Sequence, residues 1–190
     1  LFDVEGSNSS GTDIQNNGGV NTPVVSDYTI DREVKTINQN NTVNSLIFKD
    51  DGNLAVESGG KLNIGSGKIT VLDDSNSNIS GGEIIVNNQN LVKDGEGHLK
   101  VENTILVENN NTLVNEGLLS INGNLKTNNL IVGPLGALGG DGNIEANVQV
   151  SGTLAPGNSP GTLSITGGLV LDDSSNTEIE IESLANHDQT

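Results

Sequence analysis

Residues 152–163 read G-T-L-A-P-G-N-S-P-G-T-L, and this stretch dictates how the chain turns. Proline holds φ at about −65° and has no N–H, whereas glycine accepts positive φ. The dense alternation of these two residue types between short apolar runs predicts a tight corner that joins two β-strands. The stretch carries no ionisable side chain. We therefore interpret it as an element of the fold and not as a reactive loop.

Short strand signals lie on both sides of this corner. Residues 54–56, 62–64 and 99–101 each place two apolar side chains two positions apart, which is the alternation of a half-buried strand. Pairs of glycine or asparagine separate these runs, and no stretch sustains helical spacing beyond one or two turns. The sequence therefore predicts an all-β chain with almost no helix.

Two architectures accommodate so many short strands, namely a sandwich or barrel and a parallel β-helix. The chain has only three aromatic residues, Phe2, Tyr28 and Phe48, and a globular core usually takes much of its buried area from aromatics. A solenoid instead buries a few aliphatic side chains of each coil against the next coil. The sequence thus predicts a right-handed, single-stranded parallel β-helix with about seven or eight coils of roughly 20 residues. Asparagine clusters at its corners are expected to stack into side-chain ladders.

We expect three parts along the chain. Residues 1–23 are polar and predict a flexible leader or a strand-exchange segment, residues 24–181 form the β-helix, and residues 182–190 are a tail. No apolar run is long enough for a membrane-spanning helix. The chain begins with Leu1 and shows no signal peptide, so we expect a mature or excised segment of a longer protein.

The charge of the chain excludes some partners. The net charge is −17, from 25 acidic and 8 basic residues, whereas phosphate binding needs clustered Lys and Arg. Nucleic acid is therefore not an expected partner, and the scattered acids predict a soluble, self-repelling surface. The absence of cysteine excludes disulfides and thiolate metal sites.

Few residues suggest chemistry, and we predict no catalytic and no cofactor-binding residue. His98 and His187 have no neighbouring ligand in sequence, so we interpret His98 as structural or solvated. Asp50, Asp51 and Asn53 surround a glycine and offer the oxygen ligands that calcium prefers, but without EF-hand spacing. We predict that they are turn residues, with a calcium site as the alternative.

Three segments resemble the passenger domains of bacterial autotransporters. Residues 91–101 (LVKDGEGHLKV) resemble the autotransporter-associated β-strand repeat, L-x-K-x-G-x-G-x-L-x-V. Residues 135–144 (LGALGGDGNI) are similar to A-x-L-G-G-x-G-x-I, and residues 152–163 to G-x-L-x-P-G-N-S-P-G-T-L. The segments follow the order found in the family, within a signature region that spans residues 91–171. The residues that carry the signature are Gly139, Gly140, Gly142, Pro156, Gly157, Asn158, Pro160 and Gly161.

The resemblance implies a non-catalytic, structural or adhesive β-helix that is secreted or exposed on the bacterial surface. It would be anchored in the outer membrane if a barrel follows in the full-length protein. In that family the corresponding region supports passenger folding during secretion, which we expect of residues 135–165. The implied partners are a host or neighbouring cell surface, or further copies of the chain.

Two alternatives remain from the sequence. A solenoid has unpaired strands at its ends, so the chain could assemble into extracellular filaments by end-to-end strand pairing. A carbohydrate-active β-helix enzyme would instead need carboxylates clustered on one exposed face.

Overall fold

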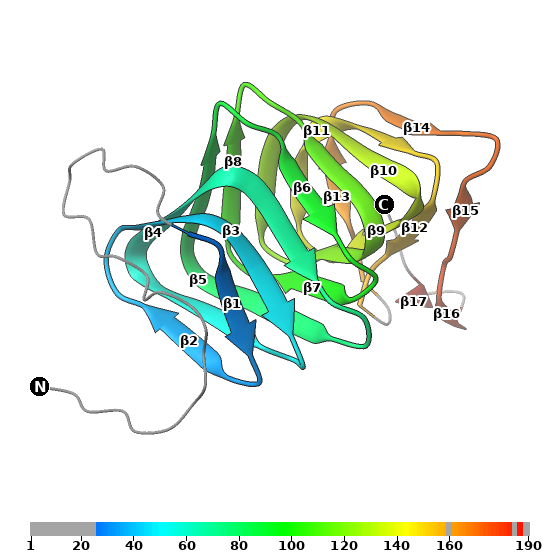
Figure 1. Ribbon diagram of the computed structural model, residues 1–190. Coiled ribbons are helices and arrows are strands. Elements are labelled where there is room, and N and C mark those ends of the chain that lie inside the picture. The colour runs from blue at the N-terminus through cyan, green and yellow to red at the C-terminus, as the bar shows by residue number, and fades with distance from the viewer. Residues whose placement is uncertain (1–25, 159–160, 184–185, 188–190) are drawn as a thin grey trace, which may run out of the picture.

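The chain folds into a parallel β-solenoid, whose coils follow one another from left to right in Figure 1. The computed structural model describes residues 26–158, 161–183 and 186–187, so the predicted leader 1–23 lies outside the described residues. Coils of about 21 residues make about seven turns, which confirms the predicted β-helix. The described residues contain no helix, and hence no helical membrane span.

The described residues form seventeen strands, fifteen of which belong to one sheet. In chain order they are β1 (Tyr28–Asp31), β2 (Val34–Ile37), β3 (Asn41–Lys49), β4 (Asn53–Val71), β5 (Asn76–Asn87), β6 (Leu91–Asp94), β7 (His98–Val101), β8 (Thr104–Glu108), β9 (Thr112–Ile121), β10 (Asn124–Gly140), β11 (Asn143–Val150), β12 (Thr153–Pro156), β13 (Ser164–Thr166), β14 (Leu169–Leu171), β15 (Asn176–Thr177), β16 (Ile181–Ser183) and β17 (Asn186–His187).

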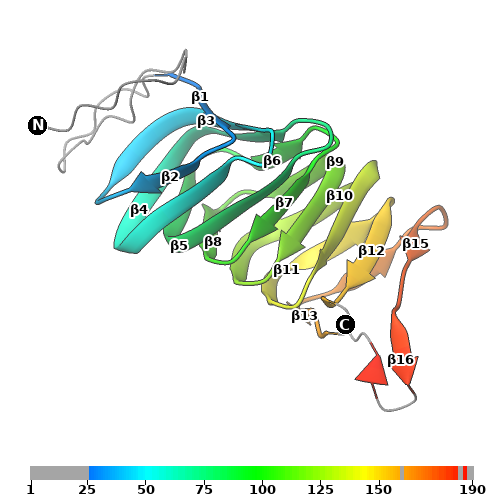
Figure 2. The same ribbon diagram turned by 90° about the horizontal axis from the view of Figure 1, so that it is seen from below.

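Parallel pairing between successive coils gives the solenoid three faces. The first face runs β1, β3, β4, β6, β9, β10, β11, β14. The second face runs β2, β4, β5, β7, β9, β10, β12, β15. The third face runs β3, β4, β5, β8, β10, β11, β13. The rungs of these faces lie side by side along the axis in Figure 2.

Several strands continue around corners, which differs from the separate short strands that the sequence predicts. Strand β4 joins the expected runs at 54–56 and 62–64 and continues through 69–71. Gly59 and Gly67 lie inside it with φ of +80° and +70°. The backbone therefore bends at glycine, while residues close to each bend stay paired with the neighbouring coil.

The core is a set of aliphatic rows along the axis. On the third face Leu62 pairs with Ile84, which pairs with Ile105, and all three side chains are fully buried. Each residue packs on its counterpart in the coils before and after, so the core stays thin and continuous. Two of the few aromatics, Tyr28 and Phe48, are buried in the first two coils.

Asparagine side chains link neighbouring coils at two of the corners. The Asn129 Nδ2 donates to Asn111 Oδ1 at 2.8 Å, and the Asn143 Nδ2 donates to Asn124 Oδ1 at 3.2 Å. The first bond joins two of the asparagine clusters in which stacking is expected, whereas the second joins paired strand residues outside those clusters.

The parallel strand pairing of the described residues runs from Tyr28 in β1 to Thr177 in β15, inside the predicted range 24–181. Strands β16 and β17 then pair with each other in antiparallel fashion, so part of the expected tail 182–190 forms a hairpin away from the stack (Figure 2).

Candidate functional site

The two C-terminal signature segments contact each other at one corner of the solenoid. Strand β12 ends at Pro156, and the chain then turns before β13 begins. The Gly157 N–H donates to the Gly140 carbonyl at 2.7 Å, and the two residues form an isolated antiparallel bridge. This bond holds the predicted corner against the end of the preceding coil.

The signature glycines stand where the backbone of an adjacent coil leaves no room for a side chain. Gly140 has φ of +106°, and a Cβ there would lie 2.2 Å from the Ile121 carbonyl oxygen. A Cβ on Gly142 would lie 2.3 Å from the Gly123 oxygen, and one on Gly139 2.8 Å from the Ala155 oxygen. Real Cβ atoms do not approach backbone this closely, so coil stacking itself requires glycine at these positions.

The remaining signature residues complete the turn. Pro156 is buried and Asn158 is exposed. A Cβ on Gly161 would lie 2.7 Å from the Asn158 backbone nitrogen, so the turn closes tightly on itself. Pro160 lies outside the described residues.

A hollow of about 220 Å³ lies beside this corner, on the outer side of the second face. Its lining includes His98, Ser120, Gly139, Pro156, Asn158 and Glu178. The His98 Nε2 and the Ser120 Oγ form a hydrogen bond of 2.8 Å. Burial lowers the pKa of His98, and the positive charges of Lys93 and Lys100 lower it further, so the imidazole is neutral at pH 7.

The His98–Ser120 bond joins β7 to β9 in the next coil. A catalytic triad needs, besides an imidazole and a hydroxyl, a third group that orients the imidazole. The His98–Ser120 bond itself links two coils, and a structural or solvated His98 stays a prediction from the sequence.

Lys93, the lysine of the repeat motif, points into the core. It lies on β6 between Ile69 and Val114 in one inward row, and only 1% of its surface is exposed. Its Nζ donates to the carbonyl oxygens of Gly95 at 2.6 Å and Glu116 at 2.8 Å. Burial lowers the pKa of Lys93 to about 8, against the opposing charges of Asp94 and Glu116. The alternation Leu91-x-Lys93 is the sequence signal for this burial, which a charged residue in a repeat motif does not suggest by itself.

Asp51 and Asn53 act as corner residues that hold the next coil. The Asp51 Oδ1 accepts a hydrogen bond from the Asn76 N–H at 2.7 Å. The Asn53 Oδ1 accepts one from the Asn78 N–H at 2.9 Å. The two side-chain oxygens therefore bind separate backbone N–H groups of the next coil. In the part of the chain that the structure describes, no three potential metal-ligating side chains form a cluster.

Asp50 is held by an ion pair, which leads to a prediction about calcium. Its Oδ2 accepts a hydrogen bond from Arg32 Nη2 at 2.7 Å, and this bond lowers the pKa of Asp50. We expect calcium, and then EDTA, to leave the Tm of the chain unchanged, because Asp50 already has a cationic partner. Scanning calorimetry measures this. A calcium-dependent rise in Tm that disappears in Asp50→Asn would show the expectation to be wrong.

Comparison of the chain with family models, with curated proteins and with solved structures found no match. The likeness to autotransporter passengers therefore depends on the three sequence segments quoted above. The evidence for the solenoid fold is the structure itself.

Proposed function

We propose that this chain is a non-catalytic structural and adhesive β-solenoid segment of a bacterial surface or secreted protein of the autotransporter type. The observation that carries the proposal is the bond between Gly157 and Gly140. It joins two separately quoted segments of the autotransporter-like signature in space. Gly140, Gly142 and Gly152 of these segments also lie too close to the backbone of an adjacent coil for a larger residue.

Residues 135–165 are proposed to support folding of the coils during secretion. Gly140 pairs with Pro156, and these partners are closer in sequence than the partners Asn53 and Asn78 in an earlier coil. A shorter loop costs less entropy to close, so this region can form its contacts early. Leu138, Leu154 and Leu163 are fully buried here and provide the apolar contacts of a first coil.

The test is surface display of the chain fused between a signal peptide and an autotransporter barrel. We expect Gly157→Val to reduce the amount of folded chain displayed at the cell surface several-fold, measured as the chain that external protease can reach. Gly157 has φ of +92°, a conformation that a valine adopts only with strain. Gly133→Val is the matched control, since a Cβ there comes no nearer than 3.4 Å to a neighbouring atom. Equal display of Gly157→Val and the unmodified chain would contradict the proposal.

Assembly into filaments is a second candidate, favoured by the apolar surface of the last coil. Leu169 and Leu171 are 37% and 45% exposed, although their partners Val148 and Val150 are buried at 1% and 0%. Exposed strand edges of this kind can pair with another copy.

Electron microscopy of the whole chain and of a chain lacking residues 1–21 separates these candidates. End-to-end assembly predicts filaments of the whole chain that are lost on removal of the leader. Monomers in both preparations would exclude filaments and leave the display proposal unaffected.

A further inference from the structure

A groove of about 710 Å³ crosses several coils at the corner between the third and first faces. It lies at the ends of the third-face segments, where the chain turns toward the first face. These segments belong to β8, β10 (residues 124–126), β11 (residues 143–145) and β13. Its polar lining includes Glu108, Asn109, Lys126, Asn128, Glu145 and Asn147.

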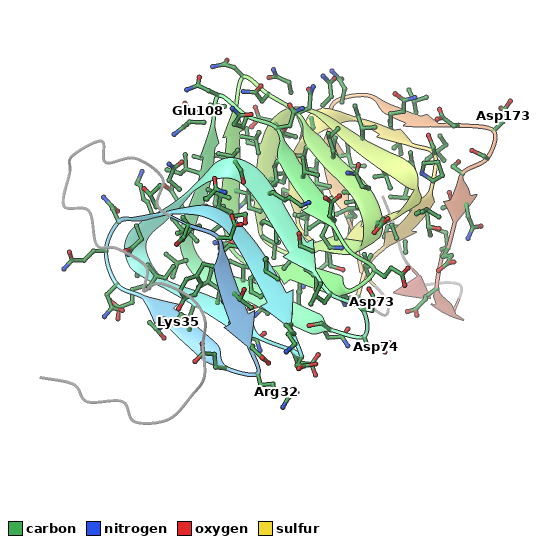
Figure 3. The ribbon with its side chains drawn as sticks, in the orientation of Figure 1. Arg32, Lys35, Asp73, Asp74, Glu108 and Asp173 are labelled. Atoms are coloured by element: carbon green, nitrogen blue, oxygen red, sulfur yellow. The ribbon has the colours of Figure 1, made fainter. Side chains whose placement is uncertain are left out.

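The groove arises from a change in coil length. Strand β8 continues to Glu108, but its pairing with β10 ends at Leu106 and Lys126. The next coil turns at Thr127, whose Oγ1 donates to the Asn110 carbonyl at 2.9 Å. The coil that contains β8 therefore extends further outward than the coils after it and forms one wall of the groove. Figure 3 shows Glu108 at the outer edge of this coil.

Amide side chains in the groove have unused hydrogen-bonding capacity. Asn109 and Asn128 are exposed, and across the described ranges their carboxamides have no hydrogen-bond partner. The Asn147 Oδ1 accepts from the Gly168 N–H at 3.1 Å, which leaves its Nδ2 as a donor. Each carboxamide offers both donors and an acceptor, which a sugar hydroxyl group can match in either direction.

The charges of the groove disfavour an acidic ligand. Among the described residues that line it, the only base is Lys126, whose Nζ lies 2.6 Å from Glu145 Oε1. Glu108 adds a further carboxylate. Leu106 is half-buried and adds apolar surface between the polar groups, which suits the C–H face of a sugar ring.

We propose that this groove binds a neutral, linear polysaccharide that runs across the coils. The corner repeats at the strand spacing of about 4.8 Å, so a polymer with a regular repeat can meet the same polar groups several times. This ligand class supplies the adhesive part of the proposed function and so rests on it. A bound chain would be held by amide hydrogen bonds and ring contacts without any chemical step.

Affinity electrophoresis tests the inference, with gels that contain a β-1,4-glucan, an α-1,4-glucan, a mannan or, as acidic comparator, polygalacturonate. We expect retardation by at least one neutral polymer and none by polygalacturonate. The double variant Asn109→Gly, Asn128→Ala should weaken binding about ten-fold or more, because two hydrogen-bonding amides are removed. Glycine is used at Asn109 because its φ is +58°.

The matched control is Asn88→Gly with Asn40→Ala. Asn88 is an exposed corner residue with φ of +60°, and neither Asn88 nor Asn40 lines the groove. The control should bind within two-fold of the unmodified chain, and circular dichroism verifies the fold of every variant. Lack of binding to all neutral polymers, preference for polygalacturonate, or unchanged binding by the groove variant would each overturn the inference. If the chain is displayed normally but binds no polymer, the polysaccharide inference is wrong, whereas the proposed structural function is unaffected.

Discussion

Gly140→Ala is expected to destabilise the solenoid by about 2–5 kcal/mol, because the new Cβ meets two obstacles. The residue has φ of +106°, a conformation that costs a side chain about 1–2 kcal/mol. The Cβ would also lie 2.2 Å from the Ile121 carbonyl oxygen, and overpacking of this kind typically costs about 1–3 kcal/mol. The backbone of the preceding coil cannot move without breaking its own pairing.

Gly59→Ala isolates the conformational part of this cost. Gly59 also has positive φ, at +80°, but nothing lies within 4 Å of the position of its Cβ. We expect this control to lose only about 1–2 kcal/mol. Urea unfolding followed by far-UV circular dichroism gives both free energies. Equal losses in the two variants would mean that contact between coils contributes nothing at Gly140.

Much of the fold could be predicted, because its rules are local. Alternating side chains at Leu62 and Ile64 predict a strand with one buried side, and a Gly-Gly pair such as Gly139-Gly140 predicts a corner. Both features hold in the structure. Short aliphatic runs without aromatics leave the stacked coil as the architecture that can bury them.

The contacts between coils could not be predicted to the residue, because coil length varies. Tyr28 pairs with Leu46, and Leu46 pairs with Ile69, at different separations along the chain. The sequence therefore does not indicate that His98 meets Ser120, a contact that depends on the register of two coils. The groove beside Glu108 has the same origin, since it exists only where a longer coil precedes shorter ones.

Lys93 is the ionisable group whose burial has the largest expected effect on stability. Its row neighbours Ile69 and Val114 are apolar, and its ammonium group reaches only two carbonyl oxygens, those of Gly95 and Glu116. A buried charge without a carboxylate partner is costly, and the lowered pKa of about 8 expresses that cost. The neutral amine retains two N–H donors, so both carbonyl bonds can persist after deprotonation.

The unfolding free energy should therefore rise between pH 8 and about 10.5. In this interval the folded chain has released the Lys93 proton, whereas the unfolded chain, with the ordinary pKa of 10.5, still binds it. Linkage makes stability increase with pH wherever the unfolded state binds more protons. A tenfold change in proton affinity is worth about 1.4 kcal/mol, so the gain is about 3 kcal/mol, and it is complete above both pKa values. Below pH 8 both states are protonated, and the contribution of Lys93 is constant.

The difference between the unmodified chain and Lys93→Met isolates this contribution from other groups that titrate in the same range. Urea unfolding at intervals from pH 7 to 10.5 should show the unmodified chain gaining about 3 kcal/mol relative to Lys93→Met as pH rises. Lys100→Met is the control on the neighbouring strand β7, where the lysine side chain is 41% exposed. It should run parallel to the unmodified chain over the whole range. A constant offset between the unmodified chain and Lys93→Met would mean that the buried amine keeps its ordinary proton affinity, and that the two carbonyls compensate the ammonium fully.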